Sequence, residues 1–289
     1  MKPIKNYGLN WELEVQQQSP EDWVFGAVSP VCIAENIPPL EREFSLPKGE
    51  CQNIGDEKMD CSTRGALNLL ETKLNWLIRY KKISADNIKF LKDNGYIKDG
   101  KIELSDRFNA ILSGTTRQGN SLKAPLDTIR SHSDPKDNIG VIPKSMFPQV
   151  SIFENYYNPN NITDEMRKLG QEFLKRFTIN YEKVLEVNMP ELLERDMLDL
   201  AGFAWSEPIN GEYPRVSFQP NHCFMGFRKP MTYIFDNYLD RGIEGDFEKK
   251  LAQDYDFLDY GYRLIIAEKK KEEKVGFWEK IIRFLKKLL

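Results

Sequence analysis

Histidine is scarce in this chain. Its 289 residues include only two, His132 and His222, so any chemistry that needs an imidazole must use one of them. His132 stands in a polar stretch before Pro135, which is typical of a loop. His222 instead opens an apolar run, residues 223–227, that reads as a buried strand. An acid–base or nucleophilic site would therefore depend on His222.

Cysteine is also scarce, and its spacing does not fit a zinc site. The four cysteines are Cys32, Cys51, Cys61 and Cys223, and the closest two are ten residues apart, whereas zinc ligands come in closely spaced pairs. No glycine-rich phosphate loop follows a predicted strand. The sequence therefore predicts neither a metal nor a nucleotide cofactor. An even number of cysteines permits disulfides, but the lack of an export signal favours reduced thiols.

Long hydrophobic runs are absent. No stretch approaches the roughly 18 apolar residues that span a bilayer, and residues 1–7 lack the apolar core of a secretory signal. Hydrophobic residues make up 40%, charged residues 29%, and the net charge is −3. This composition is ordinary for a soluble globular protein and gives no case for a nucleic-acid partner. We expect a soluble, cytoplasmic chain.

Hydrophobic periodicity predicts an α+β protein of two lobes with a cleft between them. Proline-rich residues 1–48 are expected to form an extended arm with at most one short strand. A helical lobe is expected over 49–150 and a β-rich lobe over 151–267. The predicted helices are residues 61–81 with Asp60 as N-cap, 84–94, 104–113, 122–129, 163–186 and 190–198. The predicted strands are residues 198–205, 223–227, 233–235 and 262–267.

Residues 268–289 have a different character. A charged hinge precedes residues 275–289, where apolar and aromatic side chains fill one helical face and lysines and Arg283 the other. Such a basic amphipathic helix fits a membrane surface, and it equally fits the groove of a partner or of its own domain. Both interpretations stay open, and the first would make the chain membrane-peripheral.

The order of the polar residues permits thiol chemistry. Cys61 stands at the start of the best predicted helix, where the helix dipole favours a thiolate. His222 could ionise it, and Asp236, at the end of the next strand, could orient the imidazole ring. The backbone N–H of Cys61 and the side-chain amide of Gln52 are candidate donors to an oxyanion. A buried cysteine and a satisfied core histidine are the alternative interpretation.

Several segments, in the same order along the chain, resemble motifs of the papain-like cysteine peptidases. The resemblance spans roughly residues 50–267, without close identity over any long stretch. It rests on Gln52–Gly55 leading to Asp60–Ser62, on the helix start Leu104–Phe108, on Gly119–Ser121, Val141–Pro148, Asn221–Phe227, Tyr233–Tyr238 and Gly261–Ile265.

The resemblance implies a cysteine-type hydrolase, most simply a peptidase acting on peptide or protein substrates. Cys61 would be the nucleophile, His222 the base, Gln52 an oxyanion donor and Asp236 the orienting residue. The residue that follows Cys61 differs from the family pattern. The spacing from Gln52 to Cys61 is also three residues longer than is usual in the family. His222 follows Cys61 by 161 residues, beyond the about 130–150 usual there. The orienting amide is replaced by Asp236 or shifted to Asn237.

These departures leave other functions open. Transglutaminase-like relatives resemble papain but orient the imidazole with a carboxylate, so a transglutaminase-like or amidase acyl-transfer enzyme is an alternative. A non-catalytic papain-like binding or virion structural protein is another, since divergent members of this kind resemble phage and uncharacterised bacterial proteins. The inhibitory propeptide usual in the family finds no room in residues 1–48, so we expect a narrow cleft or the arm itself to restrict the site.

Overall fold

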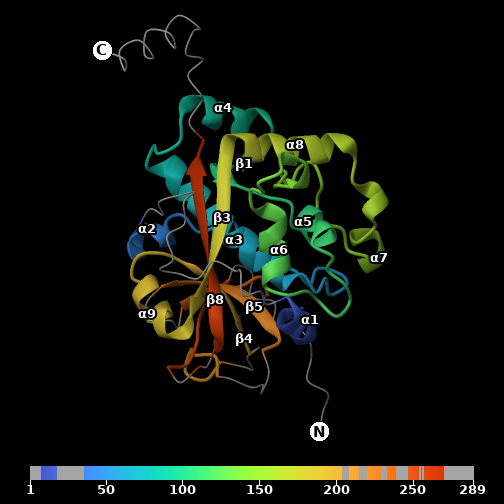
Figure 1. Cartoon of the computed structure of the whole chain (residues 1–289). Helices are drawn as coiled ribbons and strands as arrows, with labels where there is room; N and C mark the ends of the chain where they lie inside the picture. Colours follow the sequence, from blue (N-terminus) through green and yellow to red (C-terminus); the bar gives the residue numbers. More distant parts are fainter. Residues whose placement is uncertain are drawn as a thin grey trace, which may run out of the picture.

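The structure is a computed structural model, and it describes residues 8–17, 36–203, 208–214, 220–228, 233–238, 247–253, 255 and 257–269. Helices pack against one large antiparallel sheet (Figure 1), so the chain is mixed helix and sheet, as predicted. The helices are α1 Trp11–Gln16, α2 Pro39–Glu43, α3 Cys61–Arg79, α4 Ala85–Asp93, α5 Asp106–Leu112, α6 Lys123–Ile129, α7 Phe153–Tyr156, α8 Asp164–Arg176 and α9 Met189–Leu192.

Within the described residues, the sheet has six strands in the order β3-β8-β4-β5-β6-β7. They are β3 Phe177–Leu185, β4 Leu198–Gly202, β5 His222–Arg228, β6 Tyr233–Phe235, β7 Glu248–Lys250 and β8 Phe257–Glu268; a separate hairpin joins β1 Ile97–Lys98 to β2 Lys101–Ile102. Each neighbouring pair in the six-stranded sheet is antiparallel.

Helix α3 is the centre of the molecule. It contacts β4, β5 and β8 on one side and α5 and α6 on another, and Figure 1 shows it between these layers. Because neighbours surround it, its side chains are buried from Cys61 to Leu77, as expected of a helix that is not restricted to one apolar stripe. Asp60 precedes it but makes no capping bond. Asp60 stands at the N-cap position, as predicted, but its carboxylate accepts from Arg64 Nε at 2.9 Å and from the Tyr156 hydroxyl instead of bonding the first turn of the helix.

The helix predicted over residues 163–186 is half helix and half strand. Thr163 caps α8 as expected, with its hydroxyl accepting from the Met166 N–H. The helix ends at Arg176, and the next nine residues form β3, which pairs with β8 along its whole length. Apolar residues continue through this boundary, so helical periodicity alone extends too far. Pairing with a distant strand decides the conformation of 177–185, as tertiary context commonly does.

The predicted extended arm contains two short helices, α1 and α2, in its described part. Asn10 caps α1 by accepting from the Leu13 N–H. Glu14 then anchors the helix, because its buried carboxylate accepts from the Leu122 N–H and from the Tyr260 hydroxyl. The arm is therefore docked on the body, and the strand expected in it is not seen at residues 8–17 and 36–48; residues 18–35, including Cys32, lie outside the described residues.

A buried ion triad ties α3 to the sheet. Asp196 is fully buried and accepts from Lys73 Nζ of α3 at 2.6 Å and from Arg263 Nε of β8 at 2.5 Å. The apolar core is also continuous across the same boundary, with Leu70, Met225 and Leu264 in one cluster. The two predicted lobes thus share buried contacts.

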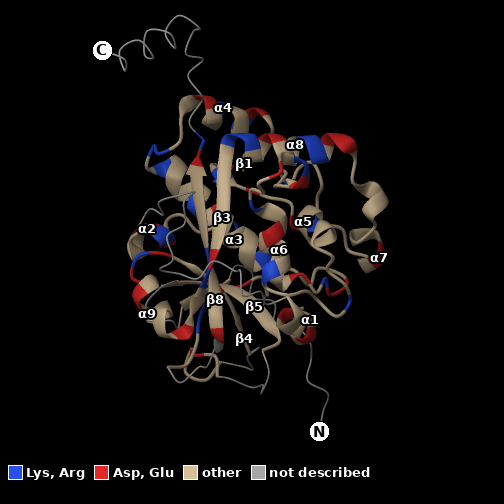
Figure 2. Cartoon of the chain, viewed as in Figure 1, with Lys and Arg blue, Asp and Glu red and all other residues tan. Residues whose placement is uncertain are grey.

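Charged residues of both signs are mixed over the molecule (Figure 2). In α8, Asp164 and Glu165 lie in the first turn and Lys175 and Arg176 in the last, positions that the helix dipole favours for these charges. Within the described ranges, no helix combines the length and apolarity needed to cross a membrane. The predicted amphipathic helix 275–289 lies outside the described residues.

Candidate active site

The thiol of Cys61 lies at the point where α3 begins. Cys61 is the first residue of the helix and is 1% exposed. Its backbone N–H and the positive end of the helix dipole therefore face the sulfur region, which favours a thiolate. Cys51, Cys61 and Cys223 are thiols that are not joined in disulfides.

His222 reaches Cys61 from the sheet. It is the first residue of β5, the strand that packs directly on α3. Its Nε2 lies 2.7 Å from Asp236 Oδ1. Because a carboxylate only accepts hydrogen bonds, Nε2 carries the proton. The ring also interacts with Cys61, by charge and by a hydrogen bond. Since Nε2 is engaged by Asp236, Nδ1 is the ring nitrogen left for chemistry at Cys61.

Asp236 is held from its other side by Lys249. The buried Nζ of Lys249 donates to Asp236 Oδ2 at 2.6 Å and to the Tyr238 carbonyl at 2.6 Å. Burial opposes ionisation of Asp236, yet Lys249 and His222 lower its pKa to about 2. Sequence reasoning missed Lys249, which lies on the edge strand β7 and carries no local motif.

These contacts favour the ion pair of Cys61 and His222. Burial alone would raise the pKa of the Cys61 thiol, but a hydrogen bond from Cys223 and the charge and hydrogen bond of His222 lower it to about 6. Burial likewise disfavours the imidazolium, yet Asp236 and Cys61 raise the pKa of His222 to about 10. Between these values the site holds a thiolate beside an imidazolium, the reactive form of a thiol nucleophile.

Gln52 lies beside the site with both protons of its amide engaged. The side chain is buried, and Nε2 donates to Glu57 Oε1 at 2.8 Å and to the Tyr238 hydroxyl at 2.9 Å. Its backbone N–H donates to the Asn237 carbonyl at 2.9 Å, which fixes it to the segment after β6. The amide of Gln52, the predicted oxyanion donor, is therefore already bonded within the protein.

Asn237 has a structural position. Its Oδ1 accepts from Asn68 Nδ2 at 2.6 Å, and its Nδ2 donates to the Glu50 carbonyl at 2.9 Å. It thereby joins α3 to the segment that leads to Gln52. Of the two proposed orienting residues, the structure brings Asp236 rather than Asn237 to the imidazole.

The N-terminal segment crosses the nucleophile. A Cβ built on Gly8 would come within 3.0 Å of Cys61 Sγ and 2.7 Å of the Met59 backbone, and Gly8 has φ +116°. The Gly8 carbonyl accepts from the Asn120 N–H at 2.9 Å, and the Leu9 N–H donates to the Asn221 carbonyl at 3.4 Å. Residues 8 and 9 thus bridge the helical part and the sheet directly over the sulfur.

Behind the nucleophile lies a buried acid that sequence reasoning missed. Asp199 of β4 is fully buried, and its carboxylate packs against Gly65, where any side chain on α3 would collide with it. Burial and the nearby Cys61 and Glu14 raise the pKa of Asp199 well above its usual range. A neutral Asp199 carboxyl does not oppose the thiolate by its charge.

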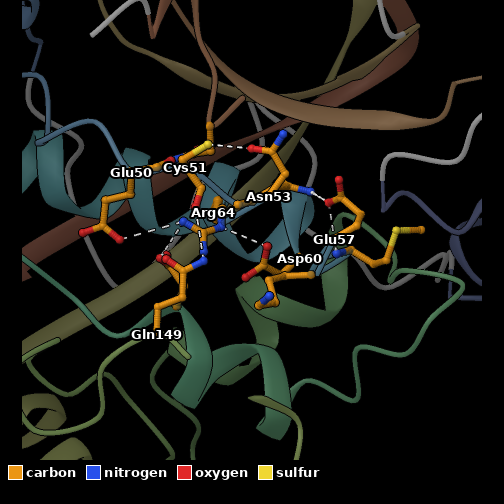
Figure 3. Close-up of polar contacts among 12 residues, drawn as sticks. Glu50, Cys51, Asn53, Glu57, Asp60, Arg64 and Gln149 are labelled. Carbon is orange, nitrogen blue, oxygen red and sulfur yellow. Dashed lines mark hydrogen bonds and ion pairs between the residues drawn. The ribbon is translucent and has the colours of Figure 1, made fainter. Parts of the chain in front are cut away.

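A buried charge cluster supports the start of α3. Arg64 lies 2.9 Å from Asp60 Oδ1 and 3.8 Å from Glu50 Oε2 (Figure 3). It also lies 2.9 Å from Asp106 Oδ2. The pKa of Asp106 is raised to about 7. Burial is the largest cause and the charge of Glu50 adds to it, whereas the charge of Arg64 lowers the pKa. The cluster fixes the first helical turn and therefore the position of Cys61.

His132 lies apart from these groups. Its Nε2 is 2.9 Å from the Asp127 carbonyl, and it lines a cavity of about 310 Å³ together with Gln17 and Thr128. In the part of the chain that the structure describes, no three or more histidine, cysteine or carboxylate side chains gather as metal ligands would.

No protein-family model matches this chain, and no curated protein matches it. Among solved structures, the chain is similar to the crystal structure of the proform of Amb a 11, a cysteine protease and major ragweed pollen allergen. The similarity has a TM-score of 0.48 at 12% sequence identity, and it covers 93% of this chain and 77% of that chain.

Proposed function

We propose that the chain is a cysteine-type hydrolase of papain-like fold, a peptidase that acts through the Cys61 thiolate. The observation that carries this proposal is the unbroken line of contacts from Lys249 through Asp236 and His222 to Cys61. Each member has a chemical reason for its place: a cation fixes the carboxylate, the carboxylate fixes the ring, and the ring ionises the thiol.

The reaction follows from this arrangement. The Cys61 sulfur attacks the substrate carbonyl carbon, a C–S bond forms, and the carbonyl electron pair moves onto oxygen. As the C–N bond breaks, His222 gives its Nδ1 proton to the leaving amine. His222 then takes a proton from water, whose oxygen attacks the thioester. The acid departs, and the thiolate is restored.

The first test is selective alkylation. At neutral pH, we expect iodoacetamide to label Cys61 at least about tenfold faster than the other three cysteines, because its surroundings lower the pKa of its thiol to about 6. The rate should rise with pH as the thiol ionises near pH 6 and hold until the imidazolium deprotonates near pH 10. His222→Ala should abolish the preference. Equal labelling of all four cysteines would contradict catalysis and favour the binding or virion structural alternative.

Acyl transfer to an amine is the second candidate, because the group that orients His222 is a carboxylate, Asp236. A transglutaminase-like enzyme and a hydrolase share the acyl-enzyme and differ in its acceptor. An amine added during turnover separates them. Mostly amide product would favour transfer, whereas mostly acid would favour the hydrolase.

The C-terminal segment carries a proposal about location. From its sequence we infer that residues 275–289 bring a cytoplasmic chain to a membrane surface or to the groove of a partner. Co-sedimentation with anionic liposomes should fall when the chain is truncated after Lys274. Equal sedimentation of both forms would leave only the groove.

A further inference from the structure

The Glu57 carboxylate is surrounded by hydrogen-bond donors that suit a negatively charged oxygen. It belongs to the loop between Gln52 and Cys61, which is three residues longer than the resemblance implies. Its Oε1 accepts from Gln52 Nε2 at 2.8 Å and from the Met59 N–H at 3.4 Å, and the Tyr238 hydroxyl bonds the same carboxylate. Figure 3 shows Glu57 in this loop, near Asn53 and Asp60.

Three donors of different kinds thus converge on one carboxylate. A side-chain amide, a hydroxyl and a backbone N–H aimed at one site are what stabilises the oxyanion of acyl transfer. The site is close to the nucleophile, because the charges of both Glu57 and Cys61 raise the pKa of the Tyr238 hydroxyl, after burial, which is the largest cause. The ring of Tyr238 also packs edge-on against His222, with centroids 5.1 Å apart.

The backbone of this loop is fixed, so a change must come from the Glu57 side chain. Buried Lys58 donates to the carbonyls of Ile54 at 3.1 Å and Ser151 at 2.6 Å, and to that of Asp56. The Tyr157 hydroxyl donates to the Lys58 carbonyl at 2.6 Å. Glu57 itself is only half-buried. Rotation of its side chain is enough to break its hydrogen bonds with Gln52, Met59 and Tyr238.

We propose that Glu57 is an internal competitor of the substrate oxyanion. Its carboxylate holds the Gln52 amide until a bound carbonyl displaces it, and its charge disfavours anionic groups beside Cys61. The proposal rests on the proposed function, because it assigns Glu57 to the same acyl-transfer site. It gives a role to the hydrogen bond from Gln52 Nε2 to Glu57 Oε1.

The test compares two alkylating agents of similar size, neutral iodoacetamide and anionic iodoacetate, on the full chain. We expect the ratio of iodoacetate to iodoacetamide rates at Cys61 to rise about tenfold in Glu57→Gln and Glu57→Ala, the scale of one hydrogen bond to a charged group. Asp56→Asn is the matched control, since it removes the same charge from the neighbouring residue. Its ratio should stay within about twofold of the parent chain.

A second background checks the donor. In Gln52→Ala, the gain from Glu57→Ala should shrink, because the amide that would receive the iodoacetate carboxylate is gone. A ratio that changes equally in Glu57→Ala and Asp56→Asn would overturn the proposal, and so would no change in either. Slow iodoacetamide labelling of Cys61 in the parent chain would instead contradict the proposed function. Glu57→Gln preserves side-chain shape and keeps the test available if the alanine variant folds poorly.

Discussion

At the residue scale, the reactivity of Cys61 depends on side chains that act on it through His222. Asp236 fixes the proton on Nε2, and Lys249 fixes Asp236. Both are buried, so their charges are weakly screened and strongly coupled. The chemistry of one sulfur is therefore set partly by a lysine on the edge strand β7.

Asp236→Ala should weaken the imidazolium and, with it, the thiolate. The pKa of His222 should fall below about 10 and that of Cys61 should rise above about 6, because the largest favourable charge on the ring is lost. The pH at which alkylation of Cys61 reaches half its maximum should then move upward. The variant also leaves Lys249 buried without its carboxylate, so the double variant with Lys249→Met separates this effect from loss of stability. An unchanged profile in both would contradict the role of Asp236.

Gly8→Ala should uncover the nucleophile. The new Cβ would meet the Met59 backbone at 2.7 Å and Cys61 Sγ at 3.0 Å, in a conformation with φ +116° that L-residues rarely adopt. We expect the segment to lift and iodoacetamide labelling of Cys61 to accelerate several-fold. Gly114→Ala is the control, since Gly114 has φ +80° and open space around its Cβ. Equal acceleration in both variants would assign the effect to general loosening.

At the element scale, the N-terminal turn of α3 is shaped by a cluster whose charge state changes with pH. Asp106 has its pKa raised to about 7, whereas an unfolded aspartate ionises near 4. The folded state therefore holds more protons between these values. By linkage, the contribution of Asp106 to the free energy of unfolding decreases as pH rises from about 4 to about 7 and then stays constant.

Asp106→Asn should flatten that dependence. Urea unfolding of the parent chain and the variant at several pH values gives the difference in unfolding free energy at each pH. We expect the variant to gain stability relative to the parent as pH rises from about 4 to about 7, because it has no proton to lose. A difference that is constant across this interval would contradict the raised pKa.

Elements were predictable where the signal is local. Helix α3 and strand β5 follow from periodicity, which also placed Cys61 at a helix start and His222 directly before the strand predicted over 223–227. Residues 177–185 were misassigned because their conformation depends on pairing with β8, which lies far away in the sequence. Asp60 was correctly assigned to the N-cap position of α3, but its carboxylate bonds Arg64 and Tyr156, and this arrangement has no local signal in the sequence.

The residues of the candidate site also differ in whether the sequence alone indicates them. Cys61, His222 and Asp236 were found through their order along the chain, and the structure brings all three together. Lys249, Glu57 and Tyr238 were not, since a lysine in a strand and an acid in a loop have no signature until the fold places them. Gln52 was proposed from the sequence as an oxyanion donor, but its bond to Glu57 depends on side-chain positions that the sequence does not encode locally.

At the scale of the whole molecule, Asp196 joins the helical part to the sheet. It compensates two buried cations at once, Lys73 of α3 and Arg263 of β8. Asp196→Ala should lower the free energy of unfolding by about 3–5 kcal/mol, because it leaves both charges buried without their partner. Asp93→Ala, which breaks the exposed pair with Lys89, should cost at most about 0.5 kcal/mol. Similar losses in urea unfolding would contradict a linking role for Asp196.

The segment over Cys61 comes from residue 8, the nucleophile from residue 61, and the imidazole and its carboxylate from residues 222 and 236. During synthesis, the thiol and its cover therefore emerge long before the groups that ionise it. A nascent chain carries an ordinary, unreactive cysteine, and the reactive one arises only when the last strands join the sheet. The rate at which Cys61 becomes open to alkylation would accordingly report when the fold is complete.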